Sequence, residues 1–156
     1  MWYRENVPSG SLVVEGPPHG ITLFAYAAIS ADMAEGDAPA EKVLEGHALT
    51  MAQFTESSVF WTRRMGEDPR VTAAFSDAFT KAQDAKKPLV TLSVEEWAAL
   101  AAAIEDAGAP QPPLAARKLS TADYMRLVRH WAKALGADPN LARAHEAAMA
   151  RIREGV

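Results

Sequence analysis

Helix-starting signals recur along the chain and leave little room for strands. Asp68-Pro69 and Asp138-Pro139 each place a capping carboxylate directly before a proline, which suits the first turn of a helix. Ser93 and Glu96 have the spacing of a capping box, and Ser120 is a further N-cap residue. Because each signal precedes an amphipathic segment, the sequence predicts an all-α fold, a helical bundle.

The limits of the predicted helices follow from these caps and from the glycines and prolines between them. The sequence predicts six helices, with Gly66 and Gly136 as helix ends, over residues 21–35, 38–65, 69–85, 94–107, 121–135 and 139–154. The β-prone segments 11–15 and 89–92 could pair as a short two-stranded β flap that uses the N-terminal arm. No internal repeat is visible.

The length of 156 residues suits a single helical domain, 1–156. Within it, composition separates an extended arm (1–20), an acidic helical body (21–108), a Pro-rich linker (109–119) and a basic helical hairpin (120–154). Residues 1–112 hold eight Lys and Arg against sixteen Asp and Glu, whereas residues 113–156 hold eight against four. Because these opposite charges share one chain, we expect the basic hairpin to pack on the acidic body.

Several classes of site have no signature in the sequence. Cysteine is absent, which excludes disulfides, thiolate chemistry and cysteine-bound metals. His145-Glu146 does not continue into a zinc-binding helix motif, and the chain has neither a nucleophile elbow nor a glycine-rich phosphate loop. We therefore predict no metal and no cofactor.

The compartment is predicted from what the N-terminal half lacks. The first ten residues do not combine a basic start with an apolar run, as a signal peptide would. The longest nearly uncharged stretch, residues 21–31, falls short of the ~20 residues that span a bilayer. We expect a soluble, cytoplasmic protein without a membrane partner.

The predicted helix 38–65 holds the candidate site. Wound at 3.6 residues per turn, one face gathers a histidine and hydroxyls inside an aromatic stripe: Leu44, His47, Met51, Phe54, Ser58, Trp61, Thr62 and Met65. We interpret this face as an apolar pocket for a hydrophobic or aromatic small molecule, with His47 as an acid–base catalytic residue. The ligand contacts would come from Tyr26, Met51, Phe54, Ser58, Trp61 and His145. In the alternative interpretation these histidines and tryptophans are core residues with satisfied polar atoms.

Two other functions stay open at this point. Leu49 and Phe60 lie on a second apolar side of the same predicted helix, which would suit a non-catalytic homodimer or a partner protein. The basic hairpin resembles a helix-turn-helix, with Arg126, Arg129 and Lys133 on its polar side, so DNA is a third possible partner. We expect nucleic acid to be disfavoured, because most of the chain is acidic. The sequence decides neither the ligand nor whether the protein is an enzyme.

Overall fold

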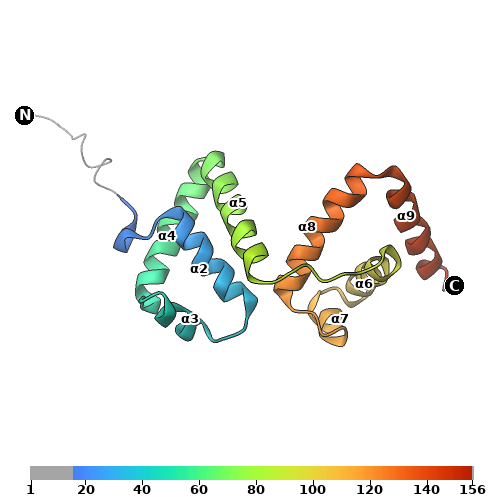
Figure 1. Cartoon of the computed structure of the whole chain (residues 1–156), viewed down its shortest axis with the longest axis horizontal. Helices are drawn as coiled ribbons and strands as arrows, with labels where there is room; N and C mark the ends of the chain where they lie inside the picture. The colour runs from blue at the N-terminus through green and yellow to red at the C-terminus, as the bar shows by residue number, and fades with distance from the viewer. Residues whose placement is uncertain (1–15, 156) are drawn as a thin grey trace, which may run out of the picture. The chain divides into compact units, whose positions relative to one another are not determined.

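The computed structural model describes residues 16–155, and in this range every regular element is a helix (Figure 1). A 3-10 turn, η1 (Pro18–Gly20), precedes the α-helices α2 (Leu23–Glu35), α3 (Ala40–Gly46), α4 (Met51–Glu67), α5 (Pro69–Lys86), α6 (Val94–Ala107), α7 (Gln111–Ala116), α8 (Thr121–Ala137) and α9 (Pro139–Arg153). The predicted all-α, helical-bundle class is therefore confirmed. The predicted β flap is wrong for its described half, because residues 89–92 form no strand; residues 11–15 lie outside the described range.

The predicted single helix over residues 38–65 is wrong, because the chain breaks between α3 and α4. Ala48 adopts a left-handed backbone with φ 57°, and the N–H of Leu49 donates to the carbonyl of Leu44 at 2.9 Å. Thr50 then starts a new helix with a full capping box: its hydroxyl accepts from the N–H of Gln53, whose side chain accepts from the N–H of Thr50. Apolar periodicity alone does not reveal such a turn.

Contacts divide the chain into two units. Among the described residues, the first unit comprises 16–33 and Asp37–Ala82, and the second comprises Ala34–Gly36 and 83–155. Residues 109–119, predicted as a linker, lie within the second unit and contain α7, with Pro113 and Leu114 buried. Three prolines here start a short helix, because proline is tolerated in a first turn.

The second unit repeats the order of elements of the first. A helix with a buried face, a short helix and two longer helices follow one another as α2–α5 and again as α6–α9 (Figure 1). The turn before α8 matches the turn before α4: Lys118 has the φ of 57° found at Ala48, and the N–H of Leu119 bonds to Leu114 at 2.9 Å. Ser120 and Asp123 repeat the capping box of Thr50 and Gln53. The chain thus contains an internal repeat, although none was predicted from the sequence.

Ring contacts repeat in the same way. In the first unit Tyr26 stacks on Phe54 with centroids 5.5 Å apart, and in the second Trp97 lies 6.3 Å from Tyr124 at a similar interplanar angle. The edge-to-face pair Phe60–Trp61, at 4.9 Å and 89°, has its counterpart in His130–Trp131, at 5.2 Å and 85°. Equivalent positions therefore hold aromatic rings in equivalent geometry, although few of the residues are identical.

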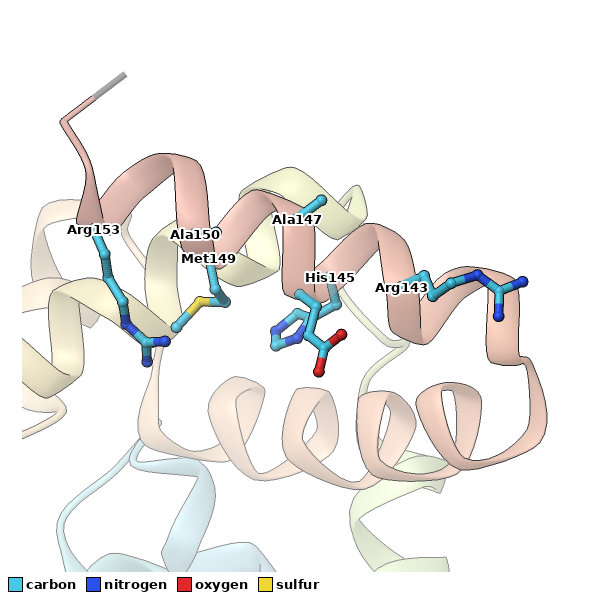
Figure 2. A pocket seen from close by; sticks show the side chains of 7 residues that line it. Arg143, His145, Ala147, Met149, Ala150 and Arg153 are labelled. Carbon is cyan, nitrogen blue, oxygen red and sulfur yellow. The ribbon is translucent and has the colours of Figure 1, made fainter.

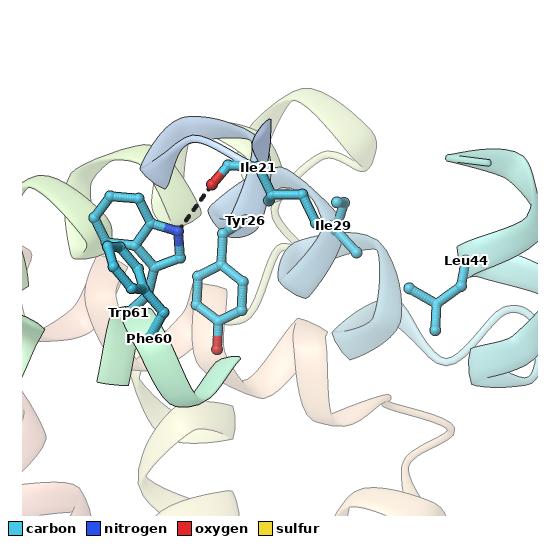
Figure 3. Close-up of a cluster of buried hydrophobic side chains, with 6 residues drawn as sticks. All are labelled: Ile21, Tyr26, Ile29, Leu44, Phe60 and Trp61. Carbon is cyan, nitrogen blue, oxygen red and sulfur yellow. Dashed lines mark hydrogen bonds between the residues drawn. The ribbon is translucent and has the colours of Figure 1, made fainter. Parts of the chain in front are cut away.

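Each unit has its own apolar core. The buried cluster of the first unit joins α2, α3 and α4 with the residue that follows η1. It consists of Ile21, Tyr26, Ile29, Leu44, Phe60 and Trp61 (Figure 3). The larger cluster of the second unit consists of Trp97, Leu100, Leu114, Leu127 and Trp131. Phe60 is buried and Leu49 packs against this first cluster, so neither forms the outward apolar side that the sequence analysis assigned to a partner protein.

Four glycines provide a test of the repeat, because they form two equivalent pairs of opposite kind. Gly36 and Gly108 adopt φ +74° and +72°, where an L side chain is strained, whereas Gly66 and Gly136 lie inside α4 and α8. The last two were predicted as helix ends, but each helix continues through its glycine by one residue. No heavy atom would lie within 4 Å of an added Cβ at any of the four positions.

We expect alanine at these positions to act in opposite directions. Gly36→Ala and Gly108→Ala should each lower the free energy of unfolding by about 1 kcal/mol through left-handed strain. Gly66→Ala and Gly136→Ala should each raise it by about 0.5–1 kcal/mol, since alanine is the better helix former. Urea unfolding followed by circular dichroism measures all four. A common sign for the four variants would contradict the assigned backbone conformations.

Candidate functional site

His47 lies in the first unit at the end of α3, where it forms a pair with Asp32 of α2. Its ring Nε2 is 2.7 Å from Asp32 Oδ2, and the two side chains are 34% and 24% exposed. The predicted pocket around His47 depended on one continuous helix, and the turn at Ala48 separates His47 from the face of α4. What the structure provides is a partly exposed His–Asp pair at the end of α3.

Other predicted site residues come together as core packing. The hydroxyl of Tyr26 shares a hydrogen bond with that of Ser58 at 3.0 Å, and the ring of Tyr26 stacks on Phe54. The indole N–H of Trp61 donates to the carbonyl of Ile21 at 3.0 Å (Figure 3). Met51, at the start of α4, is 41% exposed. The polar groups of Tyr26, Ser58 and Trp61 thus bond to one another or to backbone, as is usual for polar groups in a core.

His145 lies in the second unit and lines a pocket beside α9. The pocket has a volume of about 760 Å³, and its lining combines two arginines with apolar side chains: Arg143, His145, Glu146, Ala147, Met149, Ala150 and Arg153. In Figure 2, His145, Met149 and Arg153 extend toward the same side of α9, and Ala147 points the other way. Of the residues predicted from the sequence to bind a ligand, His145 thus lines this pocket in the described part of the chain.

Two buried ring nitrogens of the second unit have no hydrogen-bond partner in the described part of the chain: Nε2 of His145 and Nε1 of Trp131. Their counterparts in the first unit, 70 positions earlier, differ in this respect. Trp61 donates to the carbonyl of Ile21, and Phe75 has no polar atom. The internal comparison thus identifies Trp131 and His145 as unusual. With the repeat recognised, the sequence could have shown only that His145 replaces the phenylalanine of position 75, because positions 61 and 131 are both tryptophan.

The remaining unpaired buried atoms belong to Ser57, Glu35 and Arg126. Ser57 Oγ belongs to a residue with 0% exposure inside α4. Glu35 Oε1 lies 3.9 Å from Lys87 Nζ, and Arg126 Nη1 lies 3.6 Å from Asp123 Oδ1, so both atoms sit within ion pairs. None of them faces a described pocket, and we assign them no ligand.

The arginines of α8 are held by acidic and carbonyl groups of residues 1–112. Arg126 pairs with Glu35 and donates to the carbonyl of Gln83 at 2.7 Å, and its side chain is 2% exposed. Arg129 donates to Gln83 Oε1 at 2.9 Å and to Asp84 at 3.3 Å. The prediction that Arg126 lies on a solvated polar face is wrong, and its burial removes it from any phosphate-binding surface. The charge pairing expected from the sequence is present at these two residues.

Neither a metal cluster nor a membrane-spanning helix is found between residues 16 and 155. No group of three or more His, Asp or Glu side chains could hold an ion there, and no helix is long and apolar enough to cross a bilayer. The Arg70 side chain and backbone N–H donate to Asp68 and hold the pKa of that carboxyl below its usual value. Asp68 precedes Pro69 at the start of α5, so this shift belongs to a helix terminus.

Removing the buried arginine should destabilise the protein strongly. Arg126→Ala leaves Glu35, which is 1% exposed, without its main cation, so we expect a loss of about 3–5 kcal/mol in the free energy of unfolding. Arg129→Ala is the matched control on the same helix. Its side chain is 32% exposed, and we expect a loss of about 1 kcal/mol or less. Guanidinium denaturation distinguishes the two, and equal effects would contradict the burial of the Arg126–Glu35 pair.

No family model, curated protein or solved structure matches the chain. The two units of the chain therefore supply the comparison on which the functional argument rests. They share turns, caps and ring geometry, and they differ at the buried nitrogens of Trp131 and His145 and at the His47–Asp32 pair.

Proposed function

We propose that the protein binds a small apolar or aromatic molecule in the pocket beside α9. The observation that carries this proposal is the buried Nε2 of His145, which has no partner in the described chain and belongs to a residue that lines the pocket. A buried polar atom without a partner costs about 1–3 kcal/mol. A ligand that supplies a donor or acceptor to this nitrogen would recover that energy on binding.

The lining fits such a ligand in size and character. A volume of about 760 Å³ lies within the range of about 300–1,000 Å³ that small-molecule sites occupy. Met149 offers a flexible, polarizable surface, and Ala147 and Ala150 leave room along the helix. Apolar lining with a few polar groups is the usual composition of such sites.

The charges at the pocket favour a ligand that is neutral or carries one negative charge. Arg143 bonds to Asn140, and Arg153 donates to Glu105 at 3.3 Å, so both cations already have partners. Glu146 adds one carboxylate to the lining. The arginines therefore flank the site without demanding a strongly anionic ligand. This proposal concerns binding, and the His47–Asp32 pair of the first unit takes no part in it.

Replacing His145 by phenylalanine, the residue found at the equivalent position 75, should weaken ligand binding without harming the fold. The aromatic anion 8-anilino-1-naphthalenesulfonate serves as the probe, measured by isothermal titration calorimetry. We expect His145→Phe to weaken its binding at least tenfold, or about 1.4 kcal/mol. The melting temperature should stay level or rise, because the variant removes an unpaired buried nitrogen.

The matched control is His130→Phe, which also installs the first unit's residue, at position 60. His130 contacts Trp131 edge to face, with ring centroids 5.2 Å apart, and it does not line the pocket. This variant should bind the probe as the unchanged protein does. If His145→Phe retains full affinity, or if both variants lose affinity equally, the α9 pocket is not the binding site.

A further inference from the structure

The second unit has another cavity, at the turn between α7 and α8. Its volume is about 340 Å³, and it is lined by three aliphatic side chains, one cation and one carboxylate: Val90, Leu92, Leu119, Arg117 and Glu96. None of these residues lines the pocket beside α9. The cavity is large enough for a short aliphatic molecule, and its one guanidinium gives that molecule a polar end to bind.

Arg117 occupies the place that His47 holds in the first unit. Each residue follows the short helix of its unit, and each donates its backbone N–H to the buried leucine of that helix at 3.0 Å: His47 to Leu44, and Arg117 to Leu114. Each is followed by a residue with φ 57°. The same turn therefore presents a side chain that can carry positive charge in both units.

The two units differ in what neutralises this side chain. In the first unit His47 pairs with Asp32 of α2 at 2.7 Å. Matching α2 to α6 through their buried alanines, Ala27 with Ala98 and Ala31 with Ala102, places Ala103 at the position of Asp32. The second unit thus has alanine where the first unit has the acid, and arginine where the first unit has histidine.

Arg117 is held in place but has no carboxylate partner within ion-pair distance among residues 16–155. Its Nη1 donates to the carbonyl of Pro113 at 3.1 Å, which uses one of five N–H donors and orients the guanidinium. Glu96 also lines the cavity, and its Oε1 accepts from the N–H of Ser93 at 2.8 Å in the capping box of α6. The negative charge of Glu96 at the rim weakens the binding of an anion.

We propose that this cavity binds a small aliphatic monocarboxylate, which replaces the acid that the second unit lacks. The carboxylate bonds to Arg117 in the bidentate geometry that a guanidinium favours. The alkyl chain lies against Val90, Leu92 and Leu119 and buries their partly exposed surface. The proposal rests on Arg117 and Ala103 and is independent of the pocket beside α9.

The test uses the whole chain with 4-methylpentanoate as the probe, and it follows the backbone amide chemical shifts of Val90, Leu92 and Leu119, which line the cavity and are present in every variant. We expect saturable binding, which Arg117→Gln weakens at least tenfold. Glu96→Gln should tighten binding several-fold, because it removes a like charge and glutamine still completes the capping box. Lys118→Gln is the control: it removes a neighbouring charge of the same turn that does not line the cavity, and should leave affinity within twofold.

Three outcomes would overturn the proposal. The first is an absence of saturable shifts up to about 10 mM probe, a bound that ligands of this size should meet if they bind at all. The second is equal binding of the uncharged 4-methylpentan-1-ol, which would show that the guanidinium does not recognise a carboxylate. The third is equal loss of affinity in Arg117→Gln and Lys118→Gln, which would indicate general attraction by net charge.

Discussion

The hydrogen bond that closes the turn between the short helix and its successor determines the shape of each unit. Leu44 accepts from the backbone of Leu49, and Leu114 accepts from that of Leu119, each at 2.9 Å. Both leucines are almost fully buried, so the turn is fixed by packing as well as by hydrogen bonding. Because the chain reverses here through one left-handed residue, the next helix can bring its aromatic face onto the first helix of the unit.

The sequence predicted the parts of the fold that depend on local chemistry. Ser93 with Glu96, Ser120 and Asp138 cap helices in the structure as their spacing indicated. The helix break at Ala48 was not predicted, because alanine is a strong helix former and its left-handed backbone is imposed by its surroundings. The capping spacing of Thr50 and Gln53 was the local signal that could have revealed it.

The internal repeat was not predicted from the sequence, for a different reason. Equivalent positions keep a physical role rather than a residue, as Tyr26 and Trp97 or Phe60 and His130 show. The candidate site was hard to predict for the same reason, because residue type alone does not reveal physical role. An aromatic stripe with a hydroxyl has the same sequence pattern whether it lines a pocket or packs in a core. Only the hydrogen-bond partners of its polar atoms distinguish the two cases. Tyr26 and Ser58 satisfy each other, whereas His145 has no partner in the described chain; neither fact can be read from helical periodicity.

The membership of Glu35 in the second unit has a practical consequence for dividing the protein. By sequence, a fragment that begins at Gln83 contains every helix from α6 to α9 and looks complete. Such a fragment would lack the carboxylate that faces Arg126, and a buried guanidinium would be left with the carbonyl of Gln83 and the more distant Asp123. The second unit is therefore discontinuous in sequence, and an expression boundary drawn between the repeats would produce a piece with an uncompensated charge in its interior.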